Sequence, residues 1–178
     1  MAANTMAGRL RSISLLILSK MAYWIDTSDK LKLAIAPRPR GGDWLESETG
    51  QLKREGVDTL VSLLTPEESR ELGLVEEGTA CAAAGIKFHN FAIADRGLPE
   101  STSDFLSFAR SIHSEAASGR AIAAHCRACI GRSSVLLATV MRLEGFSAEE
   151  AFERISQARG MRVPDTEEQA AWVARLRL

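Results

Sequence analysis

The sequence is poor in cysteine and in aromatic residues, and it carries almost no net charge. It has three cysteines, 6% aromatic residues and a formal net charge of -1 in 178 residues. So few cysteines, in an odd number, exclude a disulfide framework and suit a reducing compartment, so we expect a cytoplasmic protein. The balanced charge gives no broad attraction to nucleic acid or to an anionic membrane, so we expect neither as a partner. Any anion-binding site must therefore be local.

The N-terminal residues do not have the pattern of a targeting segment. The apolar run Leu15–Leu18 is too short to span a bilayer, Lys20 interrupts it, and no small-residue cleavage pattern follows. We therefore expect residues 1–20 to be an N-terminal extension and residues 21–178 to be one domain. The length suits a single domain with a core of its own, and we expect a monomer.

Strand-like and helix-like segments alternate along the chain. Apolar, β-branched or short buried runs predict strands at 23–25, 31–35, 57–64, 86–93 and 121–124. Helical spacing and capping signals predict helices at 43–55, after Thr65, at 75–84, at 105–119, at 135–141, after Ser147 and after Thr166. This alternation predicts one α/β domain with a mostly parallel central sheet and helices on both faces. The strand ending at Ala124 should be an inner strand, with the next loop at its carboxyl edge.

The segment from His125 to Ser133 lies between a buried strand and a buried helix. A tight loop that enters a helix N-terminus turns several backbone N–H groups toward one point, where the helix dipole adds positive potential. We expect an anion at that point, gripped by the planar guanidinium of Arg132. Cys126 at the base of the loop sees the same groups, which favour the thiolate and make it a nucleophile. The residues expected to hold the anion are Arg127, Ala128, Cys129, Ile130, Gly131 and Arg132.

A cysteine and an arginine separated by five residues, with histidine before the cysteine and serine after the arginine, resemble the active-site loop of the cysteine-dependent protein tyrosine phosphatase superfamily. The size and layout resemble its dual-specificity branch, and the stretch from Cys126 through Arg159 and Gly160 to Gln169 is similar to the cyclin-dependent-kinase-associated phosphatase type. The resemblance implies a catalytic domain over residues 21–178 that hydrolyses phosphomonoesters of proteins. Phosphotyrosine is the expected substrate, with phosphoserine and phosphothreonine as further ones. The expected route is a cysteinyl-phosphate intermediate, with no metal or other cofactor.

Three residues are expected to assist Cys126. The resemblance implies a general acid on a loop about thirty residues upstream, which Asp95 matches, although aspartate also serves in turns and caps. Ser133 is expected to donate a hydrogen bond to the sulfur, and its alternative is an ordinary first-turn serine. His125 should point away from Cys126 and brace the loop, since adjacent residues of a strand face opposite sides. A satisfied core histidine is the alternative.

The role of Gln169 is open at this stage. It falls where related enzymes place a residue that orients water, yet a capping box with Thr166 is a complete structural explanation. Asp165, a second acid near that turn, is expected only to begin the cap. Cys129 and Ser134 depart from the family pattern because glycine is usual at the first position and common at the second, and a β-carbon at Cys129 is expected to strain the loop.

Other functions fit parts of the same segment. Cys126 and Cys129 form a C-x-x-C pair between strand and helix, which is typical of a thiol-disulfide oxidoreductase, but that reading gives Arg132, Ser133 and the Asp95 loop no role. A non-catalytic phosphate-binding module would use the same loop. A zinc site from His125, Cys126 and Cys129 lacks a fourth ligand. Peroxide could also drive a Cys126–Cys129 disulfide that regulates a phosphatase.

Overall fold

The structure is a computed structural model that describes residues 20–178. The expected N-terminal extension, residues 1–20, therefore lies almost wholly outside the described residues. Within residues 20–178, no helix has both the length and the apolar character needed to cross a bilayer.

Five strands form a single sheet in the order β1-β2-β5-β3-β4. β1 runs antiparallel to β2, and the other neighbouring strands are parallel. The register places Ala124 beside Ile35 on one side and Val61 on the other, so β5 is an inner strand, as the sequence predicted. The strands are β1 (Tyr23–Trp24), β2 (Lys32–Ile35), β3 (Thr59–Ser62), β4 (Lys87–Asn90) and β5 (Ala121–His125).

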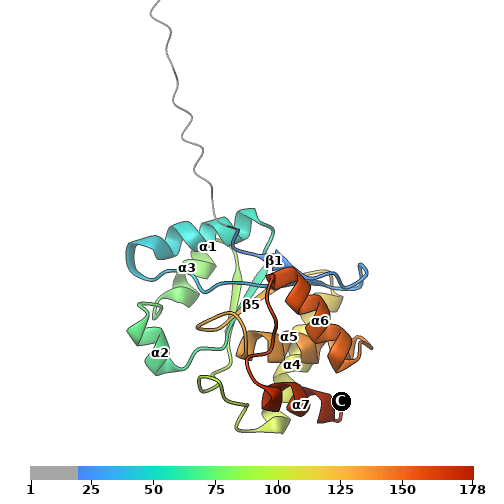
Figure 1. Cartoon of the computed structure of the whole chain (residues 1–178). Coiled ribbons are helices and arrows are strands. Elements are labelled where there is room, and N and C mark those ends of the chain that lie inside the picture. Colours follow the sequence, from blue (N-terminus) through green and yellow to red (C-terminus); the bar gives the residue numbers. More distant parts are fainter. Residues whose placement is uncertain (1–19) are drawn as a thin grey trace, which may run out of the picture.

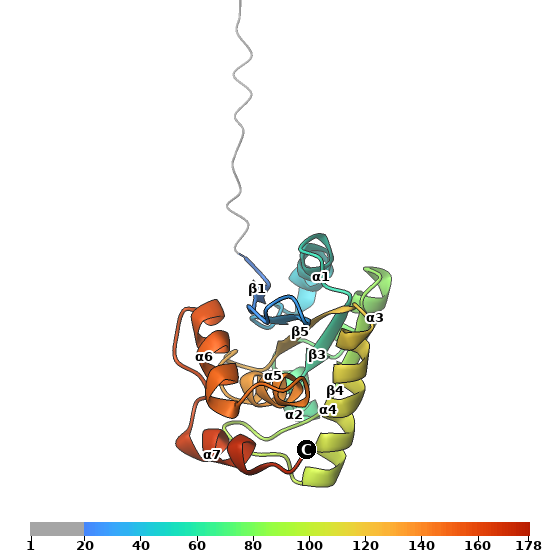
Figure 2. The ribbon, with the colours of Figure 1, turned by 90° about the vertical axis from the view of Figure 1, so that its right-hand side faces the viewer.

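Helices cover both faces of this sheet, and the predicted fold class is confirmed (Figure 1). α1 and α3 lie on one face over a core that includes Leu52, Leu60 and Cys81. α4, α5 and α6 lie on the other over a larger apolar core, and α7 lies at the end of the molecule away from α1 (Figure 2). The helices are η1 (Gly42–Trp44, a 3-10 turn), α1 (Leu45–Arg54), α2 (Pro66–Glu71), α3 (Glu77–Ala83), α4 (Thr102–Ala117), α5 (Arg132–Leu143), α6 (Ala148–Arg159) and α7 (Glu167–Arg175).

The segment after β3 shows how local sequence signals set the position of the site. The predicted strand 57–64 is regular only over Thr59–Ser62, but Leu63 N still donates to His125 O at 3.0 Å, which holds the chain beside β5. α2 then begins at Pro66 with a full capping box, in which Thr65 and Glu68 satisfy each other's backbone N–H groups. Glu68 is thereby fixed close to the carboxyl edge of the sheet.

Candidate active site

The loop between β5 and α5 lies at the carboxyl edge of the sheet, between the ends of β2 and β3. Ala36 N donates to Ala124 O at 2.9 Å, and Ser62 pairs in register with His125. Cys126 follows β5 directly and is only 2% exposed. Its Sγ lies 3.5 Å from Oγ of Ser133, so the two residues predicted to act together are in contact.

The surroundings of Cys126 favour its thiolate. Burial by itself raises the pKa of this thiol, but several donors outweigh that effect: the Ser133 hydroxyl and the backbone N–H groups of Ser133 and Ile130. The positive charge of Arg132 acts in the same direction, and the net pKa lies below its ordinary value. The loop therefore supplies an anion-stabilising environment around the sulfur.

Cys129 and Gly131 determine the backbone conformation of the loop and its packing against the next loop. Cys129 has φ of +58°, the left-handed region that glycine adopts most easily, so the expected strain at this position is present. A β-carbon on Gly131 would lie 2.9 Å from Oε1 of Gln169 and 3.1 Å from Cβ of Asp165. Glycine at 131 therefore lets the loop from α6 to α7 pack directly against the anion loop.

Arg132 begins α5 and is buried, with its side chain 1% exposed. Its two terminal nitrogens each donate to one carboxylate oxygen of Glu68, Nη1 at 2.7 Å and Nη2 at 2.9 Å. Nη1 also donates to the backbone oxygen of Ile93 at 2.8 Å. Glu68 was not singled out from the sequence, because its burial on the first turn of α2 was not visible from the pattern.

Asp95 follows β4 in the loop that the sequence predicted, and it also reaches Arg132. Its Oδ1 accepts from Nη2 at 2.9 Å, while its side chain is 58% exposed. The structure thus brings Asp95 to the loop that holds Cys126 and Arg132, so these residues meet from two separate parts of the chain. In this arrangement Asp95 accepts a hydrogen bond from Arg132, whose guanidinium was assigned to anion binding from the sequence.

Gln169 connects the anion loop to the Asp95 loop. Thr166 caps α7 by accepting from the backbone N–H of Gln169 at 3.1 Å. The reciprocal half of the predicted capping box is wrong, because the Gln169 side chain instead donates to Gly97 O at 3.1 Å. Its Oε1 is buried with no hydrogen-bond partner among the described residues. Asp165 directly precedes the N-cap Thr166, and its side chain pairs with Arg96 at 3.2 Å.

His125 lies on the opposite side of β5 from the anion loop, as strand geometry requires. It is fully buried, and its Nε2 is 2.8 Å from Oε1 of Glu77, which is itself 2% exposed. Sequence reasoning did not identify Glu77, since an acidic residue in the first turn of a helix is ordinary. No three metal-ligating side chains lie together within the described part of the chain.

Arg127, the loop residue next to Cys126, forms its ion pair with a residue outside the loop. Arg127 donates to both carboxylate oxygens of Glu71 on α2, at 3.0 and 2.7 Å. Cys129 is buried, and its pKa is raised to about 12 because burial outweighs the opposing positive charge of Arg159, and the Cys126 charge adds a smaller increase. A thiol with this pKa is almost wholly protonated at neutral pH, so it would attack a disulfide only slowly.

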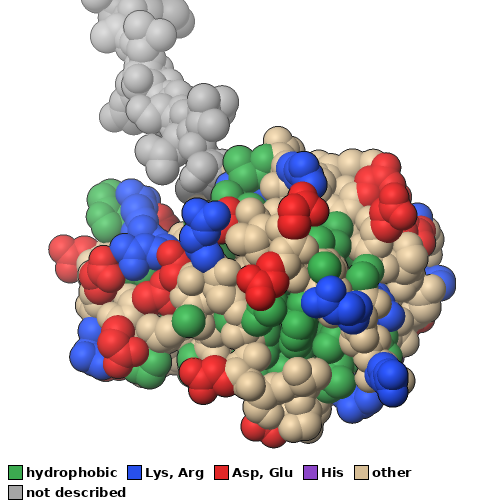
Figure 3. Space-filling model, turned by 60° about the horizontal axis from the view of Figure 1, so that its bottom comes forward, with side chains coloured by type: hydrophobic (Ala, Val, Ile, Leu, Met, Phe, Trp, Pro, Cys, Tyr) green, Lys and Arg blue, Asp and Glu red, His purple; other side chains and the backbone are tan. Residues whose placement is uncertain are grey.

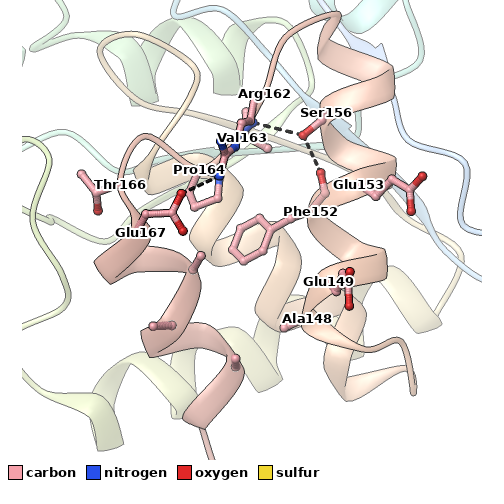
Figure 4. Close-up of a pocket in the computed structure, with 13 residues that line it drawn as sticks. Ala148, Glu149, Phe152, Glu153, Ser156, Arg162, Val163, Pro164, Thr166 and Glu167 are labelled. Atoms are coloured by element: carbon pink, nitrogen blue, oxygen red, sulfur yellow. Dashed lines mark hydrogen bonds and ion pairs between the residues drawn. The ribbon is translucent and has the colours of Figure 1, made fainter.

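A separate cavity of about 610 Å³ lies between α6 and α7 (Figure 4). Phe152 and Ala148 line it from α6, and Val163 and Pro164 line it from the connecting loop. Val163 N donates to Ser156 Oγ at 3.1 Å, which ties that loop to α6. None of the residues that line it belongs to the loop from Cys126 to Arg132, so we do not assign it to the anion loop.

The comparisons with known proteins agree with this geometry. Residues 36–145 match the family model described as "Polymorphic toxin system, DSP-PTPase phosphatase", and this range contains Asp95, Cys126 and Arg132. No curated protein sequence is significantly similar to the chain.

Solved structures share the fold at low identity. The kinase associated phosphatase (KAP), with its catalytic cysteine substituted by serine, has a TM-score of 0.77 at 18% identity, covering 88% of this chain and 93% of that one. PTPMT1 in complex with PI(5)P has a TM-score of 0.69 at 20% identity, covering 87% and 93%. TpbA of P. aeruginosa, as a cysteine-to-serine variant in complex with pTyr, has a TM-score of 0.54 at 17% identity, covering 89% and 90%.

Proposed function

Because this chain belongs to the DSP-PTPase phosphatase family of polymorphic toxin systems and is therefore a cysteine-dependent phosphatase, we propose that it hydrolyses phosphotyrosine in proteins through a cysteinyl-phosphate intermediate on Cys126. The observation that carries the proposal is the convergence of donors on one buried sulfur. Ser133 Oγ, two backbone N–H groups and the charge of Arg132 all favour the Cys126 thiolate. A thiolate in an anion-binding loop is the nucleophile that this chemistry needs.

In the first step the Cys126 thiolate attacks phosphorus while the bond between phosphorus and the tyrosine oxygen breaks. The protonated carboxyl group of Asp95 gives its proton to the departing oxygen. Arg132 binds the phosphate with donors that Glu68 does not hold. Nη1 is occupied by Glu68 and Ile93, whereas one Nη2 donor is held only by the exposed Asp95. A phosphate oxygen therefore takes the place of Asp95 on Nη2 and frees its carboxyl group for the leaving group.

In the second step a water molecule attacks the thiophosphate, and the bond between sulfur and phosphorus breaks. Asp95, now a carboxylate, accepts the proton of the water. The Ser133 hydroxyl, 3.5 Å from the sulfur, stabilises the departing thiolate. Gln169 is assigned to orient the water, because its buried Oε1 has no partner among the described residues and lies against Gly131.

The charges near the loop favour a protein over a polyphosphorylated lipid headgroup. Arg127 is paired with Glu71, and Arg96 with Asp165. On the face seen in Figure 3, both acidic and basic side chains border a hydrophobic patch. These pairs leave little uncompensated positive charge for additional phosphates, whereas a single phosphotyrosine needs only the loop and Arg132.

A substrate panel tests the proposal. The panel holds phosphotyrosine, phosphoserine and phosphothreonine peptides, an aryl phosphate and phosphoinositide vesicles, with Cys126→Ser as the control. The phosphoinositide is included because Arg38, just after β2 at this edge, has no acidic partner among the described residues. We expect turnover of phosphotyrosine peptide above all others, and none by Cys126→Ser. Faster turnover of the phosphoinositide would reject the substrate assignment, and turnover by Cys126→Ser would reject the nucleophile.

A further inference from the structure

A buried pair of opposite charges lies directly behind the nucleophile, and the chemistry described so far does not use it. Glu77 begins α3, and His125 ends β5. The two side chains are 2% and 0% exposed, and their nearest atoms are 2.8 Å apart. Their neighbours on this face of the sheet are mostly apolar, including Cys81 and Ala123. Two charged groups persist in such surroundings only when each is compensated.

The pair is held by charge more than by an aligned hydrogen bond. Neither ring nitrogen of His125 has a hydrogen-bond partner of good geometry among the described residues, although Nε2 is within contact distance of the carboxylate. Burial alone would lower the pKa of His125, but Glu77 and the Cys126 thiolate outweigh it and leave that pKa raised. The charges of Glu77 and Cys126 thus favour the imidazolium form of His125, which lies between a buried carboxylate and the residue next along the chain.

Among the residues that the structure describes, the other titratable group facing this pair is Cys81, on the same helix as Glu77. Its pKa is raised to about 12, by burial first and by the charge of Glu77 second, so it stays a neutral thiol. Ser62 of β3 lies beside His125 in the register and does not titrate. The charges that act on His125 thus come from Glu77 on one side and Cys126 on the other.

A first-turn glutamate also has a purely structural explanation, since it complements the helix dipole. That explanation requires only that the carboxylate lie near the helix N-terminus, where it is normally exposed to water. Glu77 instead turns inward and is almost fully buried against the imidazole. Its position fits a role toward His125 better than a role in capping α3.

We propose that Glu77 is a positioning residue for the nucleophile: its carboxylate keeps His125 in the imidazolium form, and this pair holds Cys126 as a thiolate at the start of the anion loop. The inference rests on the proposed function, in which Cys126 is the nucleophile. It adds a residue on α3, outside both the loop and the Asp95 segment, to the machinery that activates the sulfur.

The test is the rate at which iodoacetamide alkylates Cys126 as a function of pH, with mass spectrometry to locate the label. Glu77→Gln should alkylate roughly 3- to 10-fold more slowly than the unmodified protein on the acidic limb and reach the same rate at high pH, because a smaller fraction is thiolate. Glu77→Asp, which keeps the charge, should lie closer to the unmodified profile. Glu48→Gln removes another buried carboxylate, whose partner is Arg40, and should change nothing.

A Glu77→Gln protein that is folded and alkylates with an unchanged pH profile would overturn the inference. If Glu77→Gln does not fold, the measurement moves to Glu77→Gln combined with His125→Gln, which buries no charge. In that double variant, Cys126 should again be alkylated more slowly than in the unmodified protein at acidic pH. A pH profile equal to that of the unmodified protein would overturn the inference. Alkylation needs no phosphorylated substrate, so this result is independent of whether the protein hydrolyses phosphotyrosine.

Discussion

Two carboxylates contact the same guanidinium from regions of the molecule that differ in rigidity and exposure. Glu68 stands on the first turn of α2, its side chain is 10% exposed, and it takes one donor from each terminal nitrogen of Arg132. Asp95 stands on a loop, its side chain is 58% exposed, and it takes a single donor. A buried bidentate contact fixes the arginine, whereas an exposed single contact can be exchanged for substrate. The same kind of ion pair thus serves as a permanent support in one region and a replaceable partner in the other.

The largest expected effect comes from Asp95→Asn, which removes the exchangeable partner. Loss of a general acid should lower kcat on phenyl or alkyl phosphate by about 10² to 10⁴ and flatten the basic limb of the pH profile. The loss should be much smaller on an aryl phosphate whose leaving group needs no proton. Stability should barely change, because exposed ion pairs contribute about 1 kcal/mol or less. If Asp95→Asn keeps its rate and pH profile while Asp165→Asn loses them, the acid has been misassigned.

Glu68→Gln, unlike Asp95→Asn, should mainly lower the free energy of unfolding. Breaking one side of a buried ion pair costs about 3 kcal/mol, since Arg132 then stays buried with less compensation. Denaturant unfolding measures this cost, with Glu71→Gln as the control, because Glu71 binds the more exposed Arg127. Equal stability of the two variants would mean that Glu68 does not support Arg132.

The same contact makes a prediction about pH. Burial alone raises the pKa of Glu68, but hydrogen bonds from Arg132 and from the Thr65 N–H outweigh it, so the folded-state pKa lies below the ordinary value of 4.5. The stabilisation is therefore complete above pH 4.5 and is lost as the pH falls through the folded-state value. Unfolding experiments between neutral and acidic pH should show a steeper loss of stability for the unmodified protein than for Glu68→Gln. Parallel curves would contradict this.

The smallest expected effect concerns competition for Arg132. If phosphate replaces Asp95 on Nη2, then Asp95→Asn in a Cys126→Ser background should bind phosphotyrosine about two- to fivefold more tightly than Cys126→Ser alone, which is the range expected for one exposed ion pair. Calorimetric titration measures this change. Asp165→Asn in the same background is the matched control, because it removes a nearby acid that pairs with Arg96 instead. An equal gain in the control would point to general electrostatics and reject the competition.

The contrast between these two carboxylates also explains what the sequence could and could not predict. Cys126 to Ser133 is one contiguous segment between a buried strand and a buried helix, so the pattern predicted its place in the α/β sheet. Asp95 was found through the family resemblance, which implies a general acid on a loop about thirty residues upstream of Cys126. Glu68 and Glu77 were missed because acidic residues in the first turn of a helix are common. Only the packing of α2 and α3 against the ends of the strands brings them to Arg132 and His125.

The sequence did not predict the side-chain contacts of Gln169 and Arg127, for a related reason. A capping pattern specifies a backbone hydrogen bond, which Thr166 makes, but it does not determine where the Gln169 side chain goes once tertiary contacts compete. Arg127 was assigned to the substrate from its place beside Cys126, yet the structure directs its guanidinium to Glu71. Side-chain partners that are distant in the sequence, here on α2 and on the Asp95 loop, decided both outcomes.

The central claim, that the phosphoryl group passes through the sulfur of Cys126, is tested most directly by trapping it there. A reaction with radiolabelled phosphotyrosine peptide is quenched during the first turnover, and the protein is digested and mapped. We predict label on the peptide that contains Cys126, no label in Cys126→Ser, and loss of the label as product phosphate appears. Product formation during that turnover with no label on Cys126, at quench times shorter than the turnover itself, would contradict the account.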